Sequence, residues 1–168
     1  LYCTPSEAPR LWECLLRAGK PYGLVSAGLG ARDTLRFEAC LPLYGHELSE
    51  SITPLEAGLS SFVKLEKGNF IGYAALVKQK NEGLKRKIAA LAMVGRGIAR
   101  AGYRCYASNQ PVGTITSGTY APTLDKNLAL AIIDRNFADP GNNIDIEIRG
   151  KMVPAEIVQK PFYKRRKI

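Results

Sequence analysis

The chain has 168 residues and a formal net charge of +9, and 46% of its residues are hydrophobic while 23% are charged. This balance is typical of one ordinary globular domain or two small lobes, and it excludes an intrinsically disordered chain. No apolar stretch approaches the roughly 20 residues that a membrane-spanning helix requires, so we expect no membrane partner.

The amino-terminal part of the chain predicts the end of a strand and then two helices. Residues 1–3 are predicted as the strand end. The Thr-Pro-Ser-Glu stretch at 4–7 has the spacing of a capping box with proline in the first turn, and the apolar side chains of 11–16 recur on one helical face before a stop at Gly19. A second helix is predicted over 28–40, where apolar side chains again share a face.

The stretch up to residue 83 predicts further short elements. The capping-box spacing returns at 53–56 and predicts the start of a short helix, and the apolar residues of 59–65 predict a strand. Asn69 is expected to cap another helix, which ends by Gly83. Residues 1–83 therefore have the pattern of an α+β lobe.

From residue 84 onward the pattern changes to short strands separated by turns. It is clearest at 144–148, where isoleucines alternate with charged residues and predict one buried and one solvated face. An Asp-Pro-Gly-Asn turn at 139–142 precedes this strand, and Arg149-Gly150 is predicted as the hairpin turn after it. The predicted strands are 88–94, 102–107, 112–116, 128–134, 144–148 and 152–158. Such strands predict a small barrel or sandwich over 84–168.

Nothing in this pattern forms a catalytic constellation by itself. The only histidine, His46, is expected in a surface loop, and the four cysteines form no CxxC pair, so neither a zinc site nor a catalytic triad is expected. Scattered thiols indicate a reducing compartment, in which we expect them to be free and mostly buried. Arg32, Arg36 and Arg100 are candidates to bind carboxylates through the planar guanidinium group. The alternative for each is a structural ion pair, such as one between Asp33 and Arg36.

The excess of basic residues favours a negatively charged partner. Composition alone leaves open a nucleic acid, an acidic protein or a polyanionic small molecule, and it also allows that the charge only keeps the protein soluble. The chain has no motif of interleaved basic and aromatic residues, so a nucleic-acid partner is not favoured.

Several segments have residue sequences that are more informative than the composition. They read GLGARDTLRFEA at 28–39, LPLYGHEL at 41–48, TPLEAGL at 53–59, FIGYAAL at 70–76, VGTITSGTYAPTL at 112–124, IRGKMVPA at 148–155 and PFY at 161–163. In order and spacing, these segments resemble the T-proteins of the glycine cleavage system, which are folate-dependent aminomethyltransferases. The resemblance covers nearly the whole chain.

The resemblance implies a fold of three lobes around a central folate pocket. This chain would supply the end of the central, ferredoxin-like α+β lobe with residues 1–83 and a small Greek-key β-barrel lobe with residues 84–168. It would be the carboxy-terminal portion of the protein, without the first lobe, in which the family's catalytic aspartate lies. We therefore expect the 168 residues alone to be inactive.

The implied reaction takes an aminomethyl group from the lipoyl arm of H-protein. Tetrahydrofolate accepts the one-carbon unit and ammonia leaves, so lipoylated H-protein and folate are the expected partners, and no metal is expected. The expected location is the cytoplasm, or the mitochondrial matrix in a eukaryote. The alternatives are a non-catalytic folate- or protein-binding module of the same fold and a basic nucleic-acid-binding domain.

The resemblance assigns five residues to the folate site. The resemblance assigns Arg32 to the folate pocket, where a guanidinium group can bond pterin or carboxylate oxygens in a bidentate manner. Arg100 matches an arginine near the pocket entrance. Phe62 stands where relatives have an aromatic wall residue, so it stacks on folate or, alternatively, fills the core of the predicted strand. Tyr163 or Arg165 is expected to close the pocket from the carboxy-terminal tail, and no catalytic residue is assigned.

Related branches share the implied fold. A folate-binding protein of iron–sulfur assembly and RNA modification has a KGCYxGQE-like motif, whereas the matching residues 67–74 read KGNFIGYA here. Asn69 replaces the cysteine, which argues against that branch. Dimethylglycine and sarcosine dehydrogenases carry the same domains after a flavin domain, and the GLGARDTLR wording fits T-protein better than these enzymes.

Overall fold

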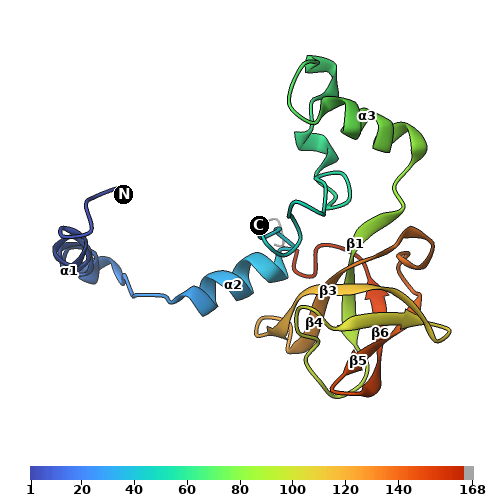
Figure 1. Cartoon of the computed structure of the whole chain (residues 1–168). Helices are drawn as coiled ribbons and strands as arrows, with labels where there is room; N and C mark the ends of the chain where they lie inside the picture. Colours follow the sequence, from blue (N-terminus) through green and yellow to red (C-terminus); the bar gives the residue numbers. More distant parts are fainter. Residues whose placement is uncertain (165–168) are drawn as a thin grey trace. The chain divides into compact units, whose positions relative to one another are not determined.

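The computed structural model describes residues 1–164 (Figure 1). The chain divides into two compact units, Leu1–Asp33 and Thr34–Ile168. Within the described residues, the helices α1 (Ala8–Gly19), α2 (Leu29–Glu38) and α3 (Tyr73–Glu82) precede a set of β-strands along the chain. No helix in residues 1–164 has both the length and the apolar character needed to cross a bilayer.

Helix α1 confirms the first predicted helix, although it begins only at Ala8. Pro9 lies in its first turn, where the missing N–H would have no helical partner in any case. The predicted capping box is instead a simple turn, in which the Glu7 amide donates to the Thr4 carbonyl (3.0 Å). The strand end predicted at residues 1–3 is wrong, because a strand needs a partner and no described residue pairs with this segment.

Helix α2 confirms the second predicted helix.

The short helix predicted to start at residues 53–56 is a single turn. The predicted capping box is present there, since the Glu56 amide donates to Thr53 Oγ1 (3.2 Å) and the Thr53 amide donates to Glu56 Oε2 (2.9 Å). One helical hydrogen bond follows, from the Ala57 amide to the Thr53 carbonyl (3.0 Å). Gly58 then adopts a left-handed φ of 80°, which ends the turn.

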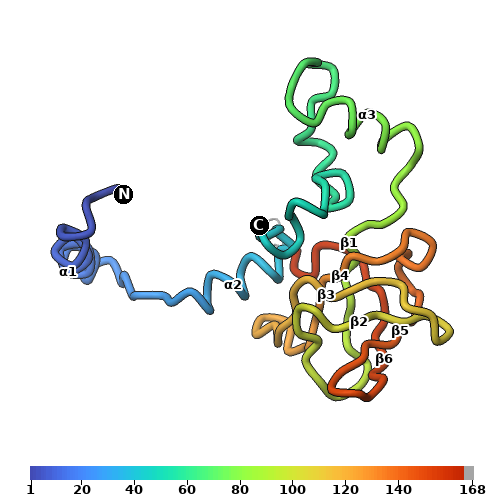
Figure 2. Tube along the Cα trace, in the orientation of Figure 1, coloured from blue at the N-terminus to red at the C-terminus, as the bar shows by residue number. Residues whose placement is uncertain are grey.

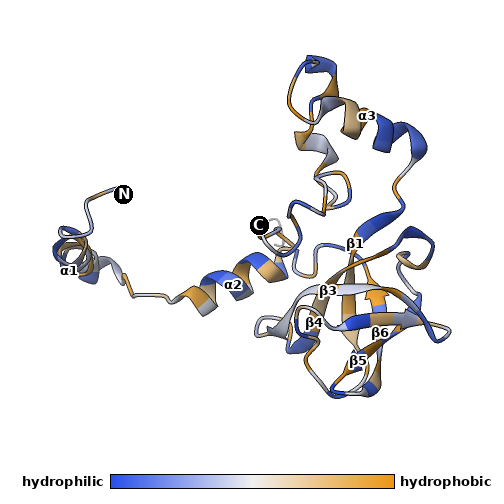
Figure 3. Ribbon diagram, in the orientation of Figure 1, coloured by the Kyte–Doolittle hydropathy of each residue, from blue (hydrophilic) through white to orange (hydrophobic). Residues whose placement is uncertain are grey.

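The segment leading to α3 also differs from expectation. The strand predicted at 59–65 is wrong, because this segment forms the 3₁₀ turns Ser60–Phe62 and Leu65–Lys67 and pairs with no strand in the part of the chain that the structure describes. Asn69 does not cap α3, because the helix begins only at Tyr73. Gly72, with φ of 88°, stands at the amino-terminal cap instead. The carboxy-terminal half of α3 is hydrophilic (Figure 3).

Six antiparallel strands form a closed β-barrel, which confirms the predicted all-β fold and each predicted strand (Figures 1 and 2). They are β1 (Arg86–Met93), β2 (Arg104–Ala107), β3 (Gln110–Ala121), β4 (Lys126–Asp134), β5 (Asn143–Ile148) and β6 (Lys151–Val158). The order around the barrel is β1-β4-β3-β2-β5-β6, and β6 pairs with β1 to close it. Hairpins join β2, β3 and β4, whereas β1 lies beside β4, as in a Greek key. The predicted lobe boundary between residues 83 and 84 stays a prediction.

The turn predicted at Arg149-Gly150 joins β5 to β6. Both residues have left-handed φ values, 51° and 77°, and Ile148 pairs with Lys151 across the turn. A two-residue turn of this kind matches the right-handed twist of the strands it connects, which confirms the predicted hairpin.

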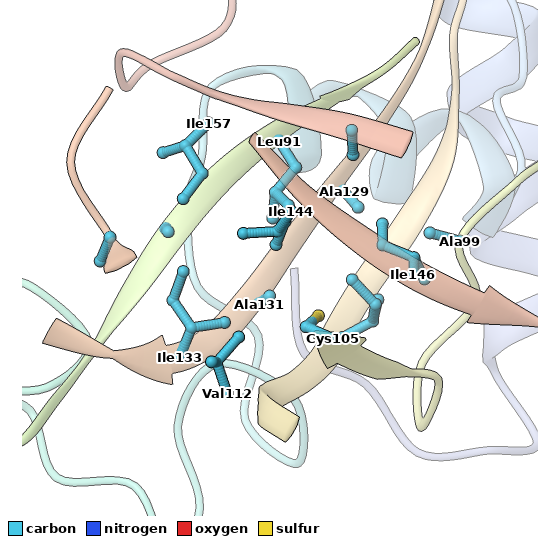
Figure 4. Close-up of a cluster of buried hydrophobic side chains, with 14 of the residues drawn as sticks. Leu91, Ala99, Cys105, Val112, Ala129, Ala131, Ile133, Ile144, Ile146 and Ile157 are labelled. Atoms are coloured by element: carbon cyan, nitrogen blue, oxygen red, sulfur yellow. The ribbon is translucent and has the colours of Figure 1, made fainter. Parts of the chain in front are cut away.

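The barrel interior is filled by side chains from all six strands. Leu91, Ile133, Ile146 and Ile157 are almost fully buried there, and Figure 4 shows their side chains pointing toward one another. Burial of each such aliphatic side chain stabilises the fold by about 1.5–3 kcal/mol relative to exposure. The interior is therefore a packed hydrophobic core.

A second apolar cluster, which we call the outer cluster, covers the outside of β1 and β4. It brings Leu128 and Leu130 of β4 together with Phe37 of α2 and Phe162 near the carboxy terminus. Alternate residues of β4 fill the interior, so β4 is buried on both faces and its sequence is a continuous apolar run. The outer cluster thereby attaches the end of α2 to the barrel wall.

Candidate functional site

The predicted folate-site residue Arg32 lies in the first turn of α2. Its amide donates to the Gly28 carbonyl (3.3 Å), which closes that turn, and its side chain is exposed. Arg32 belongs to the unit Leu1–Asp33, whereas the other described candidates belong to the second unit. An exposed guanidinium group beside a helix start is accessible to a carboxylate or a pterin oxygen.

Arg100 lies in the loop between β1 and β2. Ala99, the residue before it, is fully buried, and its carbonyl oxygen packs against Gly118 of β3. A hydrogen bond from the Tyr103 amide to the Arg100 carbonyl (3.2 Å) closes a turn after it. The loop backbone is therefore held on the barrel while the Arg100 side chain is exposed.

Phe62 and Tyr163 present aromatic rings to solvent. Phe62 is 79% exposed in its 3₁₀ turn, so the alternative reading of Phe62 as strand core is wrong. Tyr163 is 43% exposed, and its amide donates to the Glu38 carbonyl (2.9 Å) at the end of α2. The neighbouring Phe162 ring stacks against Phe37 with centroids 5.3 Å apart. Arg165 lies outside the described residues.

A buried ion pair between Arg36 and Glu47 is the centre of a polar cluster in the second unit. Arg36 Nη1 donates to Glu47 Oε2 (2.8 Å), and these side chains are only 11% and 2% exposed. Thr116 Oγ1 donates to Glu47 Oε1 (2.7 Å), and Arg36 Nη2 donates to Ser117 Oγ (3.1 Å). The Leu43 amide also donates to Glu47 (3.1 Å). This polar cluster links α2, the loop after it and β3.

Only part of the polar cluster was predicted from the sequence. Arg36 was predicted to bind a carboxylate or to form a structural ion pair, and the structural alternative is confirmed with Glu47 as partner. Glu47, Thr116 and Ser117 were not singled out. All three lie in the motif segments at 41–48 and 112–124, which was the available signal.

His46 is half-buried beside the polar cluster and not fully at the surface as expected. Its Nδ1 atom lies 2.8 Å from the Thr116 carbonyl oxygen and 3.5 Å from Ser117 Oγ. Because a carbonyl oxygen only accepts, Nδ1 carries the hydrogen in this contact. That nitrogen cannot take a proton from Ser117, so the pair does not form a nucleophile and its base.

The four cysteines are free, as predicted, but they are not mostly buried. Cys3 and Cys14 are exposed, Cys40 is half-buried and Cys105 is buried. Burial raises the pKa of the Cys40 thiol, and it raises the pKa of the Cys105 thiol to about 12. No three histidine, cysteine, aspartate or glutamate side chains gather as a metal site within residues 1–164.

A thiol reagent at mildly alkaline pH is expected to modify Cys3 and Cys14 quickly and Cys105 only after denaturation. The raised pKa leaves almost no Cys105 thiolate, and the thiolate is the reactive form. Absorbance of the released aromatic thiolate measures the rate of modification. Cys105→Ala should leave the fast phase unchanged, and a smaller fast phase in this variant contradicts the assignment.

Comparison with known proteins relates both parts of the chain to one family. Residues 86–164 match the family model of the glycine cleavage T-protein C-terminal barrel domain, and residues 1–67 match that of the GCVT N-terminal domain. The chain is 58% identical over 165 residues to the aminomethyltransferases of Caldanaerobacter subterraneus subsp. tengcongensis and Thermoanaerobacter pseudethanolicus, with 98% of this chain covered. It spans 44% and 45% of their lengths.

A solved structure agrees with this relationship. The glycine cleavage system aminomethyltransferase T from Bartonella henselae superposes with a TM-score of 0.85 at 30% sequence identity, over 95% of this chain and 44% of that chain. Helices followed by a closed barrel are therefore shared by both proteins. The chain belongs to the glycine cleavage T-protein family, and its residues 86–164 correspond to that family's C-terminal barrel domain.

Proposed function

We propose that this chain is part of an aminomethyltransferase of the glycine cleavage system. In the proposed reaction, the carbon–sulfur bond to the lipoyl arm of H-protein breaks, tetrahydrofolate accepts the one-carbon unit and ammonia leaves. The observation that carries the proposal is the 58% identity, over 98% of the chain, to proteins named aminomethyltransferase. Because the chain spans less than half of those proteins, its own role is a share of the site.

The proposed share is a set of residues that bind folate. Arg32 and Arg100 supply exposed guanidinium groups that suit the anionic and carbonyl oxygens of folate. Phe62 and Tyr163 supply exposed rings on which a flat heterocycle can stack. Arg165 would contribute a further cation from the tail. No residue of the chain is assigned a proton transfer, in keeping with a catalytic aspartate elsewhere in the enzyme.

The surface charge and the thiols fit the proposed partners and location. A net charge of +9 favours encounter with the anionic glutamate of folate and with an acidic H-protein. Four free thiols suit a reducing compartment, such as the cytoplasm or the mitochondrial matrix.

A chimeric enzyme tests the proposal. This chain would replace the matching part of the Caldanaerobacter aminomethyltransferase, and methylene-tetrahydrofolate formation from loaded H-protein would be measured. The chimera is expected to be active. Arg32→Met should raise the KM for tetrahydrofolate roughly tenfold to hundredfold, because a charge-assisted hydrogen bond is lost. Arg17→Met, an exposed arginine of α1, is the matched control and should leave the KM unchanged.

Each part of the proposal has its own contradicting outcome. A folded chimera that forms no methylene-tetrahydrofolate contradicts the proposed activity. An Arg32→Met chimera with an unchanged KM contradicts only the role of Arg32. The 168 residues alone are expected to form no product, and measurable turnover by them would place catalytic groups within this chain.

A further inference from the structure

Two adjoining pockets lie in the second unit beside the start of β1, and we call them together the β1 groove. The larger has a volume of about 340 Å³ and the smaller about 180 Å³. Leu55, Ser60 and Leu84 line both pockets, so the two spaces are neighbours along one wall. The larger volume lies within the range of small-molecule sites, roughly 300–1,000 Å³.

Basic side chains line both pockets of the β1 groove. Lys80 and Arg135 line the smaller pocket, and Lys87 and Lys160 line the larger one. Lys87 is paired with Asp139 (2.9 Å). Among the described residues, no carboxylate lies within 4.0 Å of Lys80, Arg135 or Lys160.

The acidic groups near the groove already have cationic partners. Glu56 lines the larger pocket and accepts a hydrogen bond from Arg86 (3.0 Å). The hydrogen bond from Lys87 lowers the pKa of Asp139, and the charge of Arg135 lowers it further. The groove therefore has more positive than negative charge along its walls.

Lys160 is an exposed residue whose amine is held against the larger pocket. Its Nζ donates to the Ile88 carbonyl (2.8 Å), and a Cβ added to Gly58 would lie 3.5 Å from this nitrogen. Partial burial of the amine lowers the pKa of Lys160, and the charge of Lys87 lowers it further. An anion bound here would offset both effects.

Two leucines line both pockets of the groove. Leu55 is 6% exposed and Leu84 is half-buried. We propose that the β1 groove binds an α,ω-dicarboxylate, with one carboxylate on Arg135 and Lys80, the other on Lys160, and the methylene chain along the two leucines. None of Arg32, Arg100, Phe62 and Tyr163 lines the groove, so this site shares no residue with those proposed to bind folate.

Calorimetric titration of the 168-residue chain with succinate, adipate and suberate tests the proposal, with hexanoate as the single-carboxylate control. One chain length should bind at least about tenfold more tightly than hexanoate, because the second carboxylate adds a charge-assisted contact. Arg135→Gln and Lys160→Gln should each weaken binding by about tenfold or more, and glutamine at 160 retains a donor for the Ile88 carbonyl. Lys126→Gln, outside the groove, should bind as the original chain does.

Three results would overturn the site. They are hexanoate binding as tightly as every dicarboxylate, equal weakening by Lys126→Gln, and the absence of saturable binding. Circular dichroism checks that each variant is folded. If Lys160→Gln is unfolded, the site is tested with Arg135→Gln and with Lys80→Gln, whose side chain is exposed on α3. Unchanged binding in both variants would then overturn the site.

Discussion

Replacing Glu47 with alanine is expected to destabilise the second unit by about 3–5 kcal/mol, because it removes the buried carboxylate that pairs with the Arg36 guanidinium group. The same change removes the acceptor of the Leu43 amide and one acceptor of Thr116. Thr116 retains the Leu130 carbonyl (3.0 Å), so the loss falls chiefly on Arg36 and Leu43. Urea unfolding followed by circular dichroism measures the effect as a lower midpoint.

Two control variants test whether the loss of stability comes from the buried ion pair. Glu50→Ala removes an exposed glutamate from the same loop and should change stability by less than about 0.5 kcal/mol. Glu47→Gln retains the size and an acceptor oxygen but loses the charge, so its effect should lie between the other two. Equal midpoints for Glu47→Ala and Glu50→Ala would show that the ion pair contributes nothing to stability.

Replacing Gly118 with alanine is expected to destabilise the barrel by about 3 kcal/mol or more. A Cβ at this position would lie 1.7 Å from the Ala99 carbonyl oxygen and 2.9 Å from its carbonyl carbon, which are backbone atoms that no rotamer change can move. Overpacking of a well-packed site typically costs about 1–3 kcal/mol, and a backbone clash belongs at or above the upper end. Thermal unfolding gives the stability, and limited proteolysis reports whether the loop with Arg100 has been released.

Gly30→Ala is the matched control for Gly118→Ala. No atom lies within 4 Å of a Cβ added at Gly30, and the position is inside α2, where alanine favours the helix by about 0.5–1 kcal/mol. This variant should be as stable as the original chain or slightly more stable. A Gly118→Ala protein with the original midpoint would mean that the loop can move away from β3 without cost.

Local patterns predicted the parts of the fold that depend on local interactions. The alternation of Ile144, Ile146 and Ile148 predicted β5, and the apolar face of 11–16 predicted α1. The strand predictions at 1–3 and 59–65 failed for a shared reason. A strand requires a partner strand, and apolar residues in a short run do not reveal whether that partner exists.

In the candidate site too, single residues could be predicted from the sequence, whereas their distant partners could not. Arg36 was recognisable as a candidate from its guanidinium group, but its partner Glu47 lies beyond the end of α2. No helical spacing connects the two residues. The β1 groove was invisible in the sequence, because Lys80, Arg135 and Lys160 come from three segments that only the folded chain brings to one wall.

The outer cluster has a consequence for the order in which the chain folds during synthesis. Phe37 is synthesised before all six strands of the barrel, whereas Phe162, its stacking partner, is synthesised after them. Until then, the outward side chains of β1 and β4 lack one of their covering groups, even if the six strands have already paired. Exposed apolar surface of this kind promotes aggregation of nascent chains. The packing of Phe162 on the outer cluster is therefore a late step of folding. The rate at which this segment is released from the ribosome affects the yield of folded protein.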